Sequence, residues 1–337
     1  MCPVAWAFAR PVCLGKCSLT GPTALQVARR TAMQRIDILG LGGVSVDDLV
    51  FVDAYPPADA KIVVARRERH CGGLTATALV AAARLGAACA YAGVLGTEAL
   101  SDYAIEVMAR ERIDLTHLRR EATARPLYAT IIIDQMRRTR NVFVDLNNVV
   151  GAGRDWPPPE VIQASRVLFV DSIGPEGMLR AARLARAAGI PIVADIESTG
   201  PQPTQLIQLV DHLILSWEFA RETTGAETPE LAARALWGAG RQAVVITNGD
   251  QGCWTLAADD PGRVAHQPAF QVAVVDTTGC GDVFHGAYAA GLVRGLGVGE
   301  RVRLAAAAAA LKATRPGGQA GAPTLAEVEQ FLKQADA

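Results

Sequence analysis

Short apolar runs alternate with segments of helical spacing from residue 166 to residue 249. The apolar runs are RVLFVDS, IPIVADIE, HLILS and QAVVITNG, and the helical segments include MLRAARLARAAG and LAARALWGAG. Runs that are apolar on both faces suit the strands of a parallel sheet covered by helices on both sides. The alternation therefore predicts an α/β fold. Because ligands bind beyond the carboxyl ends of such strands, we expect residues 170–172, 194–197 and 247–250 to border one cleft.

The composition and net charge indicate which kinds of molecule this protein can bind. Half of the 337 residues are hydrophobic and the formal net charge is -1, so the chain can bury a large core and has no basic field for nucleic acid or membrane surfaces. No apolar run reaches the roughly 20 residues that a membrane span requires. The seven cysteines are odd in number and form no CxxC pair, which favours reduced thiols. We therefore expect a cytoplasmic protein that acts on a small molecule.

The first 34 residues differ from the rest of the chain because they contain no acidic residue, and Asp37 is the first. This composition is typical of a targeting segment. Met33 lies just before the first strand-like run, so an upstream start or a loose tail is an open alternative. We predict an N-terminal extension over residues 1–34 and a folded domain over residues 35–331.

Two segments of alternating polarity occur near the start of this domain. Residues 47–70 and 129–146 have the period of half-exposed strands, and the second segment contains the charged turn QMRRTR. Residues 74–88, between them, have the apolar spacing of a helix. We expect the alternating segments to lie at the surface and not in the core.

The stretch VVDTTGCGDVFHGAYAAGL, residues 274–292, has the pattern of a strand joined to a helix through a glycine-rich turn. The first turn of a helix has unpaired backbone N–H groups and the positive end of the helix dipole, which together attract phosphate. Gly279, Cys280 and Gly281 let an oxyanion approach the backbone, because none has a bulky side chain. The stretch therefore predicts a phosphate-binding helix N-terminus.

Asp282 follows this turn and has two interpretations. An isolated aspartate at this position could be only a helix cap. Beside an anion-binding turn, a carboxylate suits the deprotonation of a hydroxyl that attacks phosphorus, while N–H groups stabilise the transferring oxygens. A nucleotide-linked oxidoreductase is disfavoured, because GLGGVSVDD after the first strand lacks the GxGxxG spacing.

Taken together, DTTGCGDVFHGA resembles the C-terminal signature of the ribokinase or PfkB carbohydrate kinase family. GLGGVSVDDLV is similar to the first strand of that family and HCGGLTATALVAAARLGA to its N-terminal Gly-Gly signature, so the resemblance extends over nearly all of residues 35–331. Within the family, ALKATRPGGQAGAPT and HQPAFQVAVVDTTGCGDVFHGA are most similar to sulfofructose kinases. The resemblance implies a ribokinase-like three-layer α/β/α domain with a mostly parallel central sheet. It also implies a small β-sheet lid over residues 47–70 and 129–146, and a homodimer formed through that lid.

The resemblance further implies a role for each motif residue. Asp282 would be the catalytic base, and the backbone of Gly279, Cys280 and Gly281 would form the anion hole. The residues implied for the sugar are Asp47, Gly72, Gly73, Thr77 and Asp145, and those for ATP are Thr247, Gly249 and Gly252 of TNGDQG. Asp276 and Thr278 match positions that supply backbone oxygens to a monovalent cation, so ATP with Mg²⁺ and stimulation by K⁺ are expected.

Two positions depart from the family pattern. The NxxE motif that helps organise magnesium water in many members falls at SWEF, residues 216–219, where Glu218 lies one position early. The asparagine that usually follows the Gly-Gly pair by four residues is Thr77. The first departure motivates an alternative function, a non-catalytic sugar or nucleotide sensor on a kinase scaffold.

The charges expected around the sugar favour an uncharged substrate. VDSIGPEGM, residues 170–178, contains no Arg or Lys, and the lid strand presents Asp145, whereas an anionic sugar needs cations or many donors. Arg137, Arg138 and Arg140 of the lid turn leave a sugar phosphate or sulfonate open as a substrate. The sequence thus predicts an ATP-dependent kinase that phosphorylates a hydroxyl of a small carbohydrate.

Overall fold

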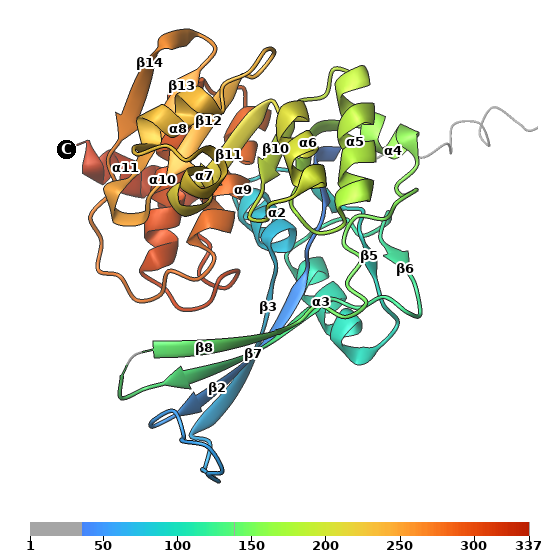
Figure 1. The fold of residues 1–337 in the computed structure, drawn as a ribbon, viewed down its shortest axis with the longest axis vertical. Coiled ribbons are helices and arrows are strands. Elements are labelled where there is room, and N and C mark those ends of the chain that lie inside the picture. Colours follow the sequence, from blue (N-terminus) through green and yellow to red (C-terminus); the bar gives the residue numbers. More distant parts are fainter. Residues whose placement is uncertain (1–35, 138, 337) are drawn as a thin grey trace, which may run out of the picture. The chain divides into compact units, whose positions relative to one another are not determined.

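A mostly parallel sheet of eight strands is the central layer of the fold (Figure 1). The computed structural model describes residues 36–137 and 139–336, so the predicted extension over residues 1–34, and Arg138 of the predicted lid turn, lie outside the described residues. The parallel strands, in spatial order, are β12 (Ala243–Thr247), β11 (His212–Ser216), β10 (Ile192–Asp195), β9 (Ser165–Val170), β1 (Ile36–Leu41) and β4 (Cys89–Tyr91). β13 (Cys253–Ala257) and β14 (Asp260–Gln267) extend the β12 edge as antiparallel strands.

Helices cover both faces of this sheet because its strands are apolar on both faces. On β9, Phe169 belongs to one buried cluster, whereas Leu168 and Val170 belong to another. The first cluster includes α2 (Leu74–Arg84), α3 (Ala99–Arg110), α9 (Cys280–Val293), α10 (Val298–Ala313) and α11 (Leu325–Ala335). The second includes α4 (Pro159–Gln163), α5 (Pro175–Ala187), α6 (Pro201–Leu209), α7 (Trp217–Thr224) and α8 (Pro229–Ala235). The predicted three-layer fold is confirmed.

A separate sheet of four strands has the order β3 (Arg66–Gly72), β2 (Ser45–Val52), β7 (Leu127–Asp134) and β8 (Thr139–Asp145) (Figure 1). β2 and β7 pair in parallel, and each of them pairs antiparallel with one edge strand. The predicted small sheet is therefore confirmed, and β2 and β3 begin and end close to the limits of the first alternating segment. A short parallel pairing of β5 (Val94–Leu95) with β6 (Arg119–Arg120) completes the strands of the described residues.

None of the helices in the described part of the chain is long and apolar enough to cross a membrane.

Asp171, the residue after β9, connects the carboxyl ends of β9 and β1 with the start of α2. It is fully buried, and burial raises the pKa of its carboxyl to about 6. Its Oδ2 accepts hydrogen bonds from the backbone N–H of Gly43 at 2.6 Å and from the hydroxyl of Thr75 at 2.8 Å, and its Oδ1 accepts one from the N–H of Ile173 at 2.7 Å. Asp171 therefore fixes the turn through which the chain passes from the central sheet into the small sheet.

Replacement of this carboxylate should destabilise the whole domain. In Asp171→Ala, the buried N–H of Gly43 and the half-buried N–H of Ile173 lose their acceptor, and the Thr75 hydroxyl keeps only the carbonyl oxygen of Leu41, so we expect the free energy of unfolding to fall by about 2–4 kcal/mol. Urea unfolding followed by circular dichroism measures the change. Asp155→Ala is the matched control, because the side chain of Asp155 is 81% exposed. An effect of Asp171→Ala no larger than that of the control would contradict the assigned role.

Candidate active site

One wall of the site is built at the carboxyl end of β12. Thr247 is the last residue of β12, and Gly249 begins the short 3₁₀ turn η1 (Gly249–Gln251). Gly252 follows with φ 86°, and a Cβ at this position would lie 2.1 Å from the carbonyl oxygen of Gln267. Only glycine fits there, because the chain leaving β14 passes directly over the loop.

The opposite wall is the N-terminus of α9, whose first turn is not capped by a side chain. The N-cap is Gly279, with φ 76°, and a Cβ there would lie 2.8 Å from the Cα of Gly318. The N–H of Cys280 donates to the carbonyl oxygen of Thr277 at 3.1 Å, so in this structure it does not point into the predicted anion hole. The next N–H groups, of Gly281 and Asp282, belong to the first helical turn and have no carbonyl four residues earlier within the helix. They are therefore the groups available to an anion.

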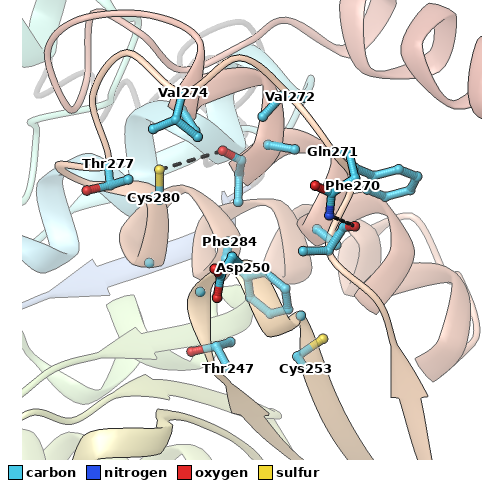
Figure 2. Close-up of a pocket in the computed structure, with 18 residues that line it drawn as sticks. Thr247, Asp250, Cys253, Phe270, Gln271, Val272, Val274, Thr277, Cys280 and Phe284 are labelled. Atoms are coloured by element: carbon cyan, nitrogen blue, oxygen red, sulfur yellow. Dashed lines mark hydrogen bonds between the residues drawn. The ribbon is translucent and has the colours of Figure 1, made fainter.

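These two walls enclose a cavity of about 400 Å³ (Figure 2). The predicted residues Thr247, Gly249 and Gly252 line it together with Cys280 and Gly281. The remaining wall is mainly apolar and includes Phe270, Val272, Val274, Phe284, Ala306, Ala309, Ala310 and Ala313. An apolar wall beside a helix N-terminus suits a ligand with a flat ring at one end and phosphate groups at the other.

The carboxyl of Asp282 lies in the first turn of α9, three residues after the N-cap, and is half-buried. Burial raises its pKa well above the usual range, and the nearby carboxyls of Asp195 and Glu197 raise this pKa further. Because Gly279 is the N-cap, the structure does not support the interpretation of Asp282 as only a cap. Its position and raised pKa are those of a group that can accept a proton.

A buried Asp–His pair lies beside this turn and was not predicted from the sequence. Asp195, at the end of β10, and His285 of α9 are both buried. Nδ1 of His285 lies 3.3 Å from Oδ2 of Asp195 and 2.8 Å from the carbonyl oxygen of Gly281, and Nε2 lies 3.1 Å from the carbonyl oxygen of Ile214. The pair thus ties the start of α9 to the end of β10 and to the middle of β11. The available signal was a single histidine in an apolar helix, three residues after Asp282.

The thiol of Cys280 is not an activated one. Burial raises its pKa to about 11, and Sγ lies 3.6 Å from the carbonyl oxygen of Ala309 (Figure 2). A neutral thiol is a poor nucleophile. Cys280 therefore acts as a small residue in the turn.

A second group of predicted residues gathers where β2 and β3 meet the central sheet. Asp47 of β2 is half-buried, and burial raises the pKa of its carboxyl. A Cβ on Gly72 would lie 2.7 Å from Oδ2 of Asp47 and 2.6 Å from Oγ of Ser45. Gly73 has φ 94°, and a Cβ there would lie 2.6 Å from the carbonyl oxygen of Gly43. A side chain at Gly72 would therefore collide with Asp47 and Ser45, and one at Gly73 would collide with the backbone of Gly43, so both positions require glycine.

Three more predicted residues differ in their surroundings, and Thr77 lies close to both groups, because its N–H donates to the carbonyl oxygen of Gly73 at 2.9 Å and a Cβ on Gly279 would lie 3.6 Å from its Cγ2. Thr77 is buried in α2, where its Oγ1 accepts a hydrogen bond from Nε2 of Gln319 at 3.5 Å, and this burial does not support direct contact with a sugar. Asp145, at the end of β8, lies 3.1 Å from Nη1 of Arg125. Glu218 is exposed in the first turn of α7. The described residues contain no group of three or more His, Cys, Asp or Glu that could hold a metal ion.

Asp276 and Thr278 shape the turn before α9. Oδ1 of Asp276 accepts a hydrogen bond from the N–H of Thr278 at 2.9 Å, and Oγ1 of Thr278 accepts one from Nη1 of Arg140 in the small sheet at 3.3 Å. The carbonyl oxygen of Asp276, which the resemblance assigns to a monovalent cation, accepts a hydrogen bond from Nζ of Lys312 at 2.7 Å. A protein ammonium group therefore contacts the oxygen that was expected to bind a metal ion.

Comparison with known proteins identifies the family. Residues 43–325 match the pfkB family carbohydrate kinases. The chain is 25% identical over 307 residues to a ribokinase of Haemophilus influenzae, an alignment that covers 88% of this chain and 98% of the relative. It is 29% identical over 283 residues to a cytidine kinase of Thermococcus kodakarensis, with 80% and 93% covered. The chain belongs to the pfkB family of carbohydrate kinases.

Solved structures agree with this assignment. A ribokinase from Thermotoga maritima has a TM-score of 0.77 at 25% identity, with 88% of this chain and 99% of that chain covered. A ribokinase from Arabidopsis thaliana, at 22% identity, has the same fold, with a TM-score of 0.77 and 89% and 99% covered. The predicted family is therefore confirmed, and the chain is a ribokinase-like carbohydrate kinase.

The left-handed turn at Gly279 can be tested with a matched glycine. Gly279→Ala and Gly295→Ala both place a side chain at a left-handed residue, with φ 76° and 78°, but only the first creates a contact with Gly318. We expect each to lower the free energy of unfolding by about 1–2 kcal/mol. Only Gly279→Ala should also weaken binding of ADP, by about tenfold or more, because it moves the first N–H groups of α9. Calorimetric titration measures the affinity, and equal ADP affinity in the two variants would contradict the role of this turn.

Proposed function

We propose that this kinase transfers the terminal phosphoryl group of ATP to a hydroxyl of a small, uncharged carbohydrate, with Asp282 as the catalytic base. The observation that carries the proposal is the position of the Asp282 carboxyl in the first turn of α9. The same turn lines the cavity that also contains Thr247, Gly249 and Gly252. A proton acceptor, an anion-binding helix N-terminus and a cavity for a ring thus occur together.

The chemistry follows from these groups. As the sugar oxygen attacks phosphorus, its proton moves to the carboxylate of Asp282, and the bond between phosphorus and the bridging oxygen of ADP breaks. The raised pKa of Asp282 makes its carboxylate a stronger proton acceptor than an ordinary aspartate. The N–H groups of Gly281 and Asp282, with the positive end of α9, stabilise negative charge on the transferring oxygens.

The nucleotide assignment is supported by solved relatives. The Arabidopsis thaliana ribokinase is described as a complex with ribose and ATP, and a ribokinase II from E. coli as a complex with ATP and Mg²⁺. When bound, Mg²⁺ neutralises charge on the phosphates. The absence of a three-ligand metal group among the described residues agrees with an ion held mostly by phosphates and water. Glu218, exposed beyond the end of β11, is the carboxylate that we propose for the hydrated ion.

An uncharged sugar is supported by the side chains near Gly72 and Gly73. Asp47 and Ser45 offer oxygen atoms that accept hydrogen bonds from sugar hydroxyls, and the Asp47 carboxylate would repel an anionic group. Arg125 is paired with Asp145 and is therefore not an unpaired cation for such a group.

One observation favours a second candidate, a sugar that carries a phosphate or sulfonate. Arg140 of β8 is exposed, and its Nη1 contacts Oγ1 of Thr278 beside the first turn of α9. β8 therefore reaches the start of α9 through Arg140, and a guanidinium there can bind either an anionic sugar or the transferring phosphoryl group. The sensor alternative has no such supporting contact, and the intact base and helix N-terminus support catalysis.

Formation of ADP from Mg-ATP tests this function across a panel of neutral aldoses and ketoses, nucleosides, sugar phosphates and sulfofructose. We expect saturable turnover with a neutral compound. Asp282→Asn should lower kcat by about 10²–10⁴-fold, because the base is lost, while ATP affinity is retained. Asp260→Asn, at an exposed position of β14, is the control.

Two outcomes would change the assignment. Turnover only with anionic sugars would establish the second candidate and give Arg140 the role of binding the substrate. Activity of Asp282→Asn close to that of Asp260→Asn would exclude Asp282 as the base.

We also propose a homodimer formed through the small sheet. β8 is an edge strand, and its Val142, Phe143 and Val144 are 48–53% exposed. The other edge, β3, has the charged sequence RRERH, and charged edges resist pairing. If β8 pairs with β8 of a second copy, its apolar side chains become buried and its unpaired backbone groups form hydrogen bonds. This supports β8 as the dimer contact.

Sedimentation velocity tests the dimer. We expect the wild-type chain to sediment as a dimer and Val142→Lys/Val144→Lys to sediment as a monomer, because two lysines place like charges across the edge. Leu231→Lys is the control, since Leu231 is 52% exposed on α8. A monomeric wild type, or a dimer that persists in the double variant, would exclude this interface.

A further inference from the structure

Lys312 is a fully buried lysine in the last turn of α10. Its Nζ donates hydrogen bonds to the carbonyl oxygens of Asp276 at 2.7 Å and Arg315 at 3.4 Å, and lies 3.5 Å from Oδ2 of Asp276. An ammonium group has three hydrogen-bond donors and no acceptor, so it needs oxygen atoms as its partners. A buried charge of this kind is stable only when such partners surround it.

The Asp276 carboxylate is held in its charged form beside this ammonium. Burial alone would raise the pKa of Asp276, but hydrogen bonds from the N–H groups of Thr278 and Gly317 and the charge of Lys312 lower it. The ammonium and the carboxylate therefore form an ion pair at the base of the turn that precedes α9.

The chain that follows α10 closes over this ion pair. The N–H of Gly317 donates to Oδ2 of Asp276 at 2.8 Å, and a Cβ on Gly321 would lie 3.2 Å from Cε of Lys312. Gly318, next to Gly317, is the residue that contacts the N-cap glycine of α9. Residues 315–321 thus pack around Lys312 and also against the turn that precedes α9.

The resemblance to the family implies a monovalent cation bound by backbone oxygens at Asp276 and Thr278. Asp276 does not fit that ion, because its carbonyl oxygen already accepts a hydrogen bond from Lys312 and its carboxylate is already paired. A second positive charge beside the buried ammonium would be repelled. The oxygen atoms of Asp276 that were expected near a metal ion thus surround the ammonium group of Lys312.

We infer that the ammonium of Lys312 replaces the monovalent cation in this chain, and that the kinase therefore needs no K⁺. The consequence for activity rests on the proposed function, whereas the consequence for stability does not. A covalently attached cation holds Asp276, and through it the N–H groups of Thr278 and Gly317, at any salt composition. The cation beside the turn is then part of the chain itself and does not depend on the concentration of an ion.

The decisive measurement compares the wild-type protein in KCl and in tetramethylammonium chloride at equal ionic strength. Three quantities are followed: the unfolding temperature, the affinity for ADP, and the rate of ADP formation with the substrate found in the panel. We expect each affinity and rate to agree within about twofold and the unfolding temperature to be the same in both salts. A several-fold gain in affinity or rate, or a specific rise in the unfolding temperature with K⁺, would falsify the inference. If no substrate is found, the unfolding temperature and ADP affinity still decide it.

Two variants of Lys312 separate the charge from the volume of the side chain. Lys312→Met keeps most of the volume without the charge, and Lys312→Ala leaves room for an ion. In tetramethylammonium chloride we expect both to weaken ADP binding by about tenfold or more relative to the wild type, and K⁺ to restore binding in Lys312→Ala. Lys333→Met, at an exposed position of α11, is the control. Wild-type ADP affinity in both variants without K⁺, or an absence of any K⁺ response in folded Lys312→Ala, would overturn the role of Lys312.

Discussion

The start of α9 depends on the carboxylate of Asp276. Its two oxygens hold the N–H groups of Thr278 and Gly317, which belong to segments on either side of α9 and α10. These bonds set the turn in which Gly279 adopts its left-handed conformation, and that turn decides which N–H groups of the helix remain open. The site that we propose for phosphate is thus made of backbone groups, and side chains act mainly by fixing the backbone that presents them.

The layers of the fold place other groups around this turn. α9 lies in the layer that packs on one face of the central sheet, with α2 and α10 beside it, so its first turn ends near the carboxyl end of β10 and the middle of β11. Asp195 and His285 couple the two layers at that point. From the small sheet, Arg140 reaches the same turn through Thr278. Three parts of the chain that are distant in sequence therefore meet where α9 begins.

Much of the fold and part of the site could be predicted because their signals are local. The alternation of apolar runs and helical segments indicated the layered α/β arrangement, and the glycines of TTGCG and TNGDQG indicated turns that approach a ligand closely. Thr247, Gly249, Gly252 and Gly281 do line one cavity with Cys280. Thr77 was harder to place, because helical spacing does not tell which side of α2 faces the interior, and its hydroxyl is buried against Gln319.

The sequence by itself determined the family, the alternation of strands and helices over residues 166–249, and positions where only glycine fits, because each depends on residues close together in the chain. The tertiary structure alone decided which charges are paired. Lys312 lies in an alanine-rich helix that gives no sign of a buried amine, and its partner Asp276 is 36 residues away. Asp195 and His285, and likewise Arg125 and Asp145, meet only when strands and helices are stacked. Electrostatic roles depend on distance in space and on exclusion of water, and neither quantity can be obtained from residue order.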